Sequence, residues 1–346
     1  EDIAEPISPE DIVAYNELRS CADLVRMYTN GKLEIQPDFQ RDFVWKQQNQ
    51  TRFIDSLVKQ LPIPSMCFSL DYKTGHWKVI DGLQRMSTII RFLGSEEWKL
   101  SDLPEIHPRL RLATNLELAG GDPEQKQIFS RVEDVSLPVT VIRCDYSKQD
   151  HMRYLFTIFH RLNSGGVRLN NQEIRNCIYN GEFNNTLKDF DENNEDWVVV
   201  KSKIWGSVDR FRSVEVILRM LAFGEWLDRY DGKLARFLND YMHIQTTDKN
   251  LDLIELKRVL ELVAAKAKIL LETESRKTPL VIVEALLVAL YKINGKIAGI
   301  SDQALQEGYE RLKSLPVFKE ERARYGVSSV ENVNRRLGSA IAEMTF

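Results

Sequence analysis

The chain has 346 residues, a length typical of two domains, and its 43% hydrophobic content permits proper cores. A net charge of −4 gives no global nucleic-acid signature, although a local basic groove is compatible with it. Four scattered cysteines and five histidines show no metal-binding or disulfide spacing, which excludes the usual zinc frameworks and fits a reducing cytosol. We expect a cytoplasmic protein without signal peptide or membrane contact, because no apolar run could span a bilayer.

The first half of the chain mixes strand and helix signals after a loose acidic arm over residues 1–10. Apolar periodicity predicts helices over 21–28, 47–60, 83–93 and 148–161, and strands over 33–35, 65–71, 77–81 and 137–144. A Lys-Thr-Gly turn at 73–75 joins two of the strands into a hairpin. The insertion over 95–134 has weak periodicity, and its role cannot be predicted.

An irregular stretch that ends at Trp45 mixes aromatic, amide and guanidinium side chains. Phe39, Phe43 and Trp45 can be core anchors, which is the ordinary role of such aromatics. Alternatively, Gln40 and Arg41 face a ligand while the aromatics fix the loop. The residue types alone leave both interpretations open.

The most informative stretch, His76–Thr88, has the pattern of a strand, a tight turn and a helix start. Asp81 or a neighbour can cap the helix, and the amide donors of the first helical turn suit an anion. Gly82 lets a ligand approach the backbone. Gln84 and Arg85 add an amide and a guanidinium that can fork onto a phosphate. A plain turn with a surface arginine is the ordinary alternative.

A third polar stretch follows the helix that ends near residue 161. Its Ser-Gly-Gly sequence ends one helix, and Asn170 or Asn171 caps the next one. Both features occur in plain connectors. However, one short loop is surrounded by five hydrogen-bonding side chains, more than a connector needs: Arg161, Asn163, Gln172, Glu173 and Arg175.

Beyond about Glu182 the strand signals fade and long helical patterns follow, which indicates a second, all-helical domain. The periodic segments are 209–230, 251–271, 279–293, 301–315 and 328–344. The apolar segment 279–290 is too short for a membrane span and predicts a buried helix. Basic residues over 313–336 favour a solvated helix face, with a nucleic-acid patch as the alternative. We therefore predict an α+β fold, with domains over 11–180 and 181–346.

Three motifs occur in order: QRDFVW at 40–45, IDGLQRMST at 80–88 and FHRLNSGGVRLNNQEIR at 159–175. Together they resemble the ParB/sulfiredoxin-like domain at the N-terminus of GmrSD-type restriction proteins, which is domain-of-unknown-function family 262. The central motif of that family is usually DGQQR. Here Leu83 replaces the first glutamine, and the other four residues of the motif remain. The resemblance covers roughly the first half of the chain.

The resemblance implies a small mixed sheet with helices, and a nucleotide pocket over the Asp81–Gly82 turn. It associates the chain with NTP binding and hydrolysis, and with bacterial defence against phage and modified DNA. Many members of the family carry a second module with an HNH-type nuclease site. The sequence predicts no HNH site here, because His243 lacks a partner histidine and the helical half has no His-Asn-His grouping.

Phosphoryl transfer needs mainly positioning and charge neutralisation, and the residue types of these motifs supply both. On this interpretation Arg41 and Arg85 clamp phosphates. Gln84 orients a phosphate or the attacking water, and Asp81 holds Mg²⁺ or caps the phosphate-binding helix. The further predicted nucleotide-binding residues are Gln40, Trp45, Gly82, Thr88, Arg161, Asn163, Gln172, Glu173 and Arg175.

Two other functions stay open on the sequence. A non-catalytic switch would use the nucleotide to reshape the junction with the helical domain and gate DNA or a partner protein. A ParB-like DNA-binding protein or nuclease would hold a metal with carboxylates such as Asp81 and Glu173. The expected partners are a nucleotide and, depending on the function, DNA or a separate nuclease or defence subunit. The nucleotide base, the DNA modification and the oligomeric state cannot be predicted.

Overall fold

The structure is a computed structural model that describes residues 9–35, 45–162, 169–205, 210–319 and 327–345. The described residues divide into two compact units, one that ends at residue 162 and one that begins at residue 169. We call them the sheet unit and the helical unit. The division falls at the loop of the third polar motif, somewhat earlier than the boundary at 180 that the sequence predicts.

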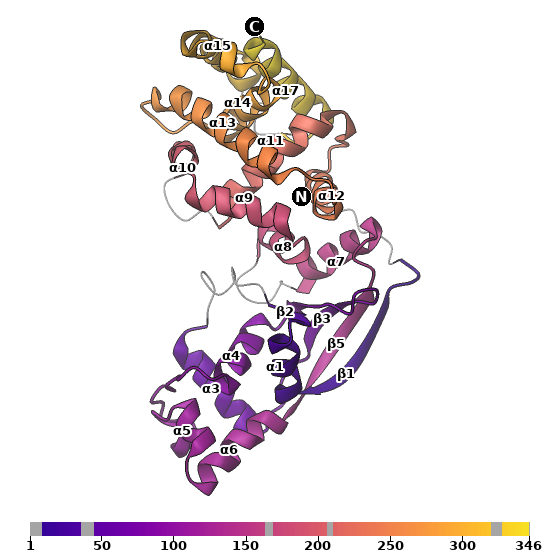
Figure 1. Ribbon diagram of the computed structural model, residues 1–346, viewed down its shortest axis with the longest axis vertical. Helices are drawn as coiled ribbons and strands as arrows, with labels where there is room; N and C mark the ends of the chain where they lie inside the picture. Colours follow the sequence, from indigo (N-terminus) through magenta and orange to yellow (C-terminus); the bar gives the residue numbers. More distant parts are fainter. Residues whose placement is uncertain (1–8, 36–44, 163–168, 206–209, 320–326, 346) are drawn as a thin grey trace. The chain divides into compact units, whose positions relative to one another are not determined.

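One mixed sheet of five strands organises the sheet unit, in the order β1-β5-β3-β4-β2 (Figure 1). The strands are β1 Val13–Ser20, β2 Leu33–Glu34, β3 Met66–Asp71, β4 Trp77–Asp81 and β5 Ser136–Cys144. β1 pairs antiparallel with β5, and β3 pairs antiparallel with β4. β3 pairs parallel with β5, and β2 with β4. The mixed sheet that the resemblance implies and the predicted β3–β4 hairpin are therefore confirmed.

The helices of the sheet unit, with the exception of α7, contribute apolar side chains to one core cluster with the sheet. The helices are α1 Cys21–Thr29, α3 Gln47–Val58, α4 Leu83–Leu93, η1 Pro108–Leu110, α5 Asn115–Gly120, α6 Pro123–Asp134 and α7 Gln149–Leu162. Met86, Ile89 and Phe92 of α4 are fully buried in a cluster that includes Phe68 and Val79 of the sheet. Each such side chain contributes roughly 1.5–3 kcal/mol relative to exposure. The core therefore fixes the direction in which α4 leaves β4.

Two parts of the sheet unit are not predicted by the sequence pattern. β1 has side chains that are mostly exposed, so its residues lack the apolar alternation of a half-buried strand. The insertion over 95–134 folds into α5 and α6. Each of these helices begins with a capping box, Thr114 with Glu117 and Asp122 with Gln125.

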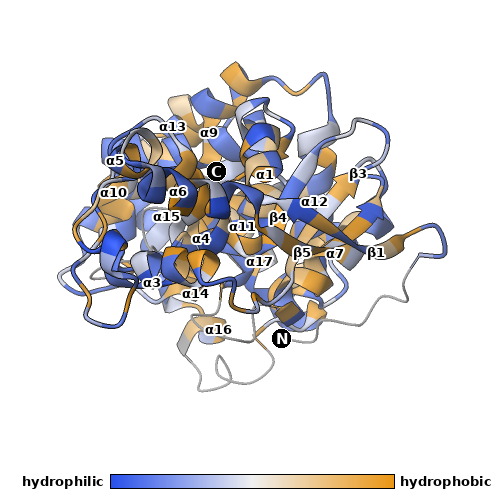
Figure 2. Ribbon diagram, turned by 90° about the horizontal axis from the view of Figure 1, so that it is seen from below, coloured by the Kyte–Doolittle hydropathy of each residue, from blue (hydrophilic) through white to orange (hydrophobic). Residues whose placement is uncertain are grey.

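The helical unit contains no strand among its described residues, as the α+β prediction requires. Its helices are α8 Asn171–Ile178, α9 Glu182–Asn193, α10 Glu195–Ser202, α11 Arg212–Trp226, η2 Leu227–Arg229, α12 Leu234–Thr247, α13 Leu253–Glu272, α14 Leu280–Lys292, η3 Ile297–Gly299, α15 Asp302–Ser314, α16 Pro316–Lys319 and α17 Val330–Met344. Apolar and polar residues alternate along most of the ribbon (Figure 2), the pattern of helices with one buried face.

α14 is the central helix of this unit and packs against α11, α13, α15 and α17. It is buried continuously from Ile282 to Leu290, which confirms the predicted buried helix. A helix that is apolar on nearly all sides is buried by neighbouring helices on every side, as in the interior of a bundle. Among the described residues, no helix combines the length and the hydrophobicity that crossing a membrane requires.

Candidate functional site

Gly82 joins β4 to α4, and the structure requires a glycine there for two reasons. Its φ of 98° lies in the left-handed region that residues with a side chain rarely adopt. A Cβ at this position would also lie 2.6 Å from Cγ of Met66, a fully buried residue at the start of β3. The turn therefore holds its backbone directly against the sheet.

The start of α4 has no side-chain cap. Gly82 is the N-cap residue, and its carbonyl accepts a hydrogen bond from the N–H of Met86 at 2.8 Å. The Asp81 carboxylate, which the sequence offers as a cap, contacts Arg85 instead. Backbone N–H groups at an uncapped helix start keep their donor capacity, which suits an anion.

Arg85 lies in the first turn of α4 and is held by a carboxylate and two carbonyls. Its Nη2 lies 2.9 Å from Oδ2 of Asp81 and 3.4 Å from the Ser65 carbonyl oxygen. Its Nη1 donates to the carbonyl of Pro64. These are the contacts of an arginine that holds its turn in place, so phosphate binding by Arg85 stays a prediction.

Asp81 and Arg85 differ in their access to solvent. The side chain of Asp81 is 44% exposed, whereas that of Arg85 is 13% exposed. Burial lowers the pKa of the Arg85 guanidinium, and the Asp81 carboxylate opposes that shift. The guanidinium stays charged at neutral pH because its ordinary pKa is so high. The turn thus presents a fixed cation beside an accessible carboxylate.

Gln84 connects the first polar motif to the second. Its Oε1 accepts a hydrogen bond from the backbone N–H of Trp45 at 2.8 Å. The Trp45 ring packs edge-on against Phe53 of α3, with 5.5 Å between ring centroids. Trp45 therefore has the contacts of a core anchor and also reaches the turn. Gln40 and Arg41, which precede it in the same motif, lie outside the described residues.

Of three other predicted nucleotide-binding residues, two are described, in α4 and α7, and one lies outside the described residues. Thr88 is fully buried, and its hydroxyl donates to the Gln84 carbonyl of its own helix at 2.7 Å. Arg161 is exposed near the end of α7. Asn163 lies outside the described residues.

The third polar motif continues into α8, which belongs to the helical unit. Asn170 caps α8, as predicted, in a capping box with Glu173. Glu173 is 3% exposed and also accepts from the Arg210 guanidinium, at 3.0 Å from Nε and 2.7 Å from Nη2. Gln172 is 1% exposed and accepts from Nη1 of Arg175 at 3.0 Å. The structure therefore gives these side chains partners inside the helical unit.

Arg175 begins a series of alternating charges that are buried or partly buried, which we call the charge chain: Arg175, Glu215, Arg219, Glu284 and Arg336. Nη1 of Arg175 lies 2.9 Å from Oε2 of Glu215, whose Oε1 lies 2.6 Å from Nη2 of Arg219. Nη1 of Arg219 lies 3.1 Å from Oε2 of Glu284, and Nη2 of Arg336 lies 3.5 Å from its Oε1. The charge chain thus links α8, α11, α14 and α17.

Electrostatics inside the charge chain follow from burial and pairing. Burial lowers the pKa of Arg175, and Glu215 opposes this shift. Burial alone would raise the pKa of Glu215, but its two arginine neighbours hold that pKa below its usual value. Each charge is therefore stabilised by its neighbours. These contacts do not support nucleotide binding by Gln172, Glu173 or Arg175, which stays a prediction.

Metal ligands do not cluster in the part of the chain that the structure describes: no three His, Cys, Asp or Glu side chains are placed to share an ion. His243 is 4% exposed and packs edge-on against Tyr179, with ring centroids 6.3 Å apart. Mg²⁺ differs from zinc because one or two carboxylates and the substrate phosphates usually hold it. The exposed Asp81 carboxylate fits that requirement.

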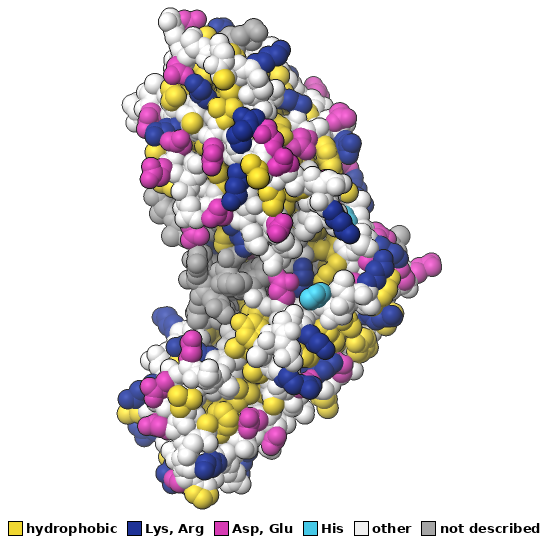
Figure 3. Space-filling model, in the orientation of Figure 1, with side chains coloured by type: hydrophobic (Ala, Val, Ile, Leu, Met, Phe, Trp, Pro, Cys, Tyr) yellow, Lys and Arg dark blue, Asp and Glu magenta, His cyan; other side chains and the backbone are white. Residues whose placement is uncertain are grey.

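Surface charge shows no single-sign region on the face drawn in Figure 3, where acidic and basic side chains are interspersed. Of the C-terminal basic residues, Lys313 pairs with Glu274 at 2.5 Å and Glu310 at 2.8 Å, and Arg336 lies in the charge chain. The pairing of Lys313 is typical of a solvated helix face, the ordinary interpretation of this segment. Arg336 departs from that interpretation, because it is 6% exposed and pairs with the buried Glu284.

Sequence reasoning missed the groups that hold the motif side chains in place. The Pro64 and Ser65 carbonyls that bind Arg85 precede it by about twenty residues, and Asn239 and Glu215, which bind Arg175, follow it by forty or more. The two prolines at 62 and 64 do signal an extended segment before β3. No local pattern reveals that its carbonyls face a guanidinium.

The mixed sheet, its charged strand–glycine–helix turn and the helical unit define an α+β protein with a candidate site at the Asp81–Arg85 turn. Residues 21–180 match the family model described as GmrSD restriction endonuclease, N-terminal domain. The match confirms that this segment resembles the N-terminal domain of GmrSD-type restriction proteins. The match includes α8 of the helical unit. No curated protein gives a significant match to the chain.

Proposed function

We propose that the sheet unit binds a nucleoside triphosphate at the Asp81–Gly82 turn and hydrolyses it with Mg²⁺, as part of cytoplasmic defence against foreign or modified DNA. One observation carries this proposal: an uncapped helix start, a fixed guanidinium and an accessible carboxylate lie within a single turn. The helix start and the guanidinium can neutralise a phosphate directly, and the carboxylate can do so only by holding Mg²⁺. The match of residues 21–180 to a restriction-endonuclease domain supports the defence context.

Each residue of the turn has a distinct role in this proposal. The N–H groups of the first turn of α4 and the Arg85 guanidinium bind phosphate oxygens. Asp81 holds Mg²⁺, which would supply charge neutralisation on the phosphates. Because Trp45 occupies Oε1 of Gln84, the Nε2 of that amide is the group that would orient a phosphate or the attacking water. Gln40, Arg41 and Asn163 remain part of the proposed site on sequence grounds.

A titration tests this proposal directly. The wild-type chain is titrated with each nucleoside triphosphate, with and without Mg²⁺, and phosphate release is then followed. We expect Mg²⁺-dependent binding and release, both weakened in Asp81→Asn because a neutral amide is a poor Mg²⁺ ligand. The matched control is Asp102→Asn, an exposed carboxylate of the same unit that pairs with Arg111 at 2.6 Å. Absence of binding by every nucleotide would contradict the proposal.

The two alternatives give different results in the same experiment. Binding without phosphate release indicates the non-catalytic switch, which would gate DNA or a separate nuclease or defence subunit. Salt-dependent DNA binding or metal-dependent nicking without any nucleotide would favour the ParB-like alternative. That alternative needs Glu173 as a metal ligand beside Asp81. The Glu173 carboxylate is instead occupied by hydrogen bonds from Arg210 and Asn170.

A further inference from the structure

β1 (Val13–Ser20) is an edge strand of the sheet that the described residues form. Among the described residues its ladder partner is β5 alone, through eight consecutive residue pairs without a bulge. Backbone N–H and C=O groups of an antiparallel strand point to the two sides on alternate residues. The outer edge of β1 therefore carries a row of donors and acceptors that can template another strand.

The usual protections of an edge strand are weak in β1. It contains no proline, and Val13, Tyr15 and Leu18 are 45%, 36% and 71% exposed. Its two charged residues are occupied: Nε of Arg19 lies 2.7 Å from Glu17, and Nη1 of Arg19 lies 2.7 Å from Asp23. These charges are paired within the chain, and β1 contains none of the lysines that commonly protect an edge strand.

From this edge we propose that two copies of the chain associate by antiparallel pairing of β1 with β1, which joins their sheets into one continuous sheet. A second copy fits because β1 is self-complementary. The outward donors alternate along the strand, so identical antiparallel strands can pair only in registers that are centred on a residue. In a register centred between two residues, residues whose N–H and C=O groups point outward would lie opposite residues whose groups point inward, so these groups could not pair.

The side chains select one register from this set. Centring on Asn16 pairs residues 13–19 with their counterparts, and places the exposed Leu18 opposite Ala14 and the single Glu17 opposite Tyr15. Centring on Glu17 places like charges directly opposite each other, which is destabilising. Centring on Leu18 pairs only residues 16–20. The register centred on Asn16 is therefore the longest one that avoids facing charges.

Disulfide trapping tests both the interface and the register. In the Asn16-centred register, position 16 faces itself, with Cα atoms about 4.5–5.5 Å apart, which is within disulfide range. The native cysteines are all buried, so they do not compete. We expect Asn16→Cys to form a covalent dimer on mild oxidation. Leu18→Cys should not, because its two copies would lie about 14 Å apart along the strands.

The double variant Ala14→Cys/Leu18→Cys completes the test, because these two positions face each other across the proposed interface and are too distant to pair within one chain. We expect it to form a covalent dimer, whereas each single variant forms no covalent dimer. Equal cross-linking of Leu18→Cys and Asn16→Cys, or no cross-linking of Asn16→Cys, would overturn the proposed register.

Sedimentation of the unmodified chain gives an independent measurement. Strand pairing buries a modest area, so we expect the average mass to rise from monomer towards dimer with increasing concentration. Leu18→Lys should suppress that rise without unfolding the protein, because Leu18 is already exposed. A monomer at every concentration would overturn the proposal. So would a dimer that Leu18→Lys leaves unchanged, since its interface would lie elsewhere.

Discussion

At the scale of single residues, Arg85 and Arg175 carry the same guanidinium in different surroundings. Arg85 lies at the edge of a turn, 13% exposed, and contacts an accessible carboxylate. The side chain of Arg175 is 1% exposed and contacts Glu215 inside the helical unit. The sequence identifies both arginines as motif residues. It does not predict how far each side chain is buried, because that depends on residues distant in the chain.

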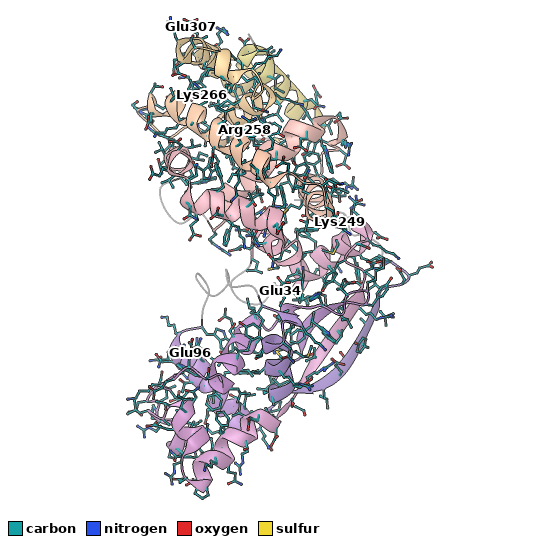
Figure 4. The ribbon with its side chains drawn as sticks, in the orientation of Figure 1. Glu34, Glu96, Lys249, Arg258, Lys266 and Glu307 are labelled. Atoms are coloured by element: carbon teal, nitrogen blue, oxygen red, sulfur yellow. The ribbon has the colours of Figure 1, made fainter. Side chains whose placement is uncertain are left out.

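The charge chain makes a clear prediction about stability. Arg175→Ala leaves Glu215 partly uncompensated, and breaking a buried ion pair by removing one partner typically costs about 3–5 kcal/mol. Arg258→Ala is the matched control, because Arg258 of α13 (labelled in Figure 4) forms an ion pair with Glu255 in which both side chains are about half exposed. We expect the control to cost under about 1 kcal/mol. Urea unfolding measures both; equal losses would contradict a structural role for Arg175.

Asp145 gives a prediction about acid stability. Its buried carboxylate lies 2.7 Å from Nζ of Lys73 and accepts from the Ser147 hydroxyl at 2.6 Å. Burial alone would raise the pKa of Asp145, but these partners lower it to about 2. Because this value lies below the unfolded pKa of about 3.9, the stabilisation is complete above pH 4 and is lost as the pH falls towards 2.

We therefore expect the melting temperature of the wild-type chain to fall between about pH 4 and pH 2, and to fall less steeply in Asp145→Asn. The variant should also be less stable than the wild type at neutral pH, where the charged carboxylate is paired. Thermal unfolding across this pH range measures both effects. Identical slopes in the two proteins would show that Asp145 does not contribute.

At the scale of elements, the β4–Gly82–α4 turn depends on its glycine. Gly82→Ala places a residue with a side chain in a left-handed backbone conformation, which lowers the free energy of unfolding by about 1–2 kcal/mol. The clash of its Cβ with Met66 lowers it by about 1–3 kcal/mol more. The control Gly75→Ala has a similar φ of 73° but nothing within 4 Å of the new Cβ. We expect Gly82→Ala to be the more destabilising variant in urea unfolding. Equal destabilisation by the two variants would mean that the Met66 side chain moves aside without a loss of stability.

Periodicity predicted most strands and the helices α3, α4, α7 and α14, because each of these helices buries a continuous apolar face. It did not predict α9, α10 or α12. It failed for β1, whose two faces are both largely exposed. The capping boxes of α5 and α6 were readable in the insertion but do not by themselves fix a fold. For the candidate site, the turn and its polar residues could be predicted, whereas the carbonyl partners of Arg85 could not.

At the scale of the whole molecule, α8 lies inside the family match but belongs to the helical unit. A fragment of residues 6–180 would therefore carry α8 without Glu215 and Asn239, the partners of Arg175. We expect fragments 6–168 and 6–180 to unfold at similar temperatures, with α8 unprotected from hydrogen exchange in the longer one. Strong protection of α8 in that fragment would show that it packs on the sheet unit by itself.

The central claim, a phosphate site at the Asp81–Gly82 turn, is tested most directly by the nucleotide affinity of Arg85→Ala and Arg85→Lys, measured beside thermal unfolding. A charge-assisted hydrogen bond contributes roughly 1.5–3 kcal/mol, so Arg85→Ala should weaken affinity about tenfold to a hundredfold. Lysine keeps the charge but loses the fork, and should restore only part of the affinity. If Arg85→Ala lowers the melting temperature while the affinity of the folded protein is unchanged, Arg85 only holds the turn and the proposed site is contradicted.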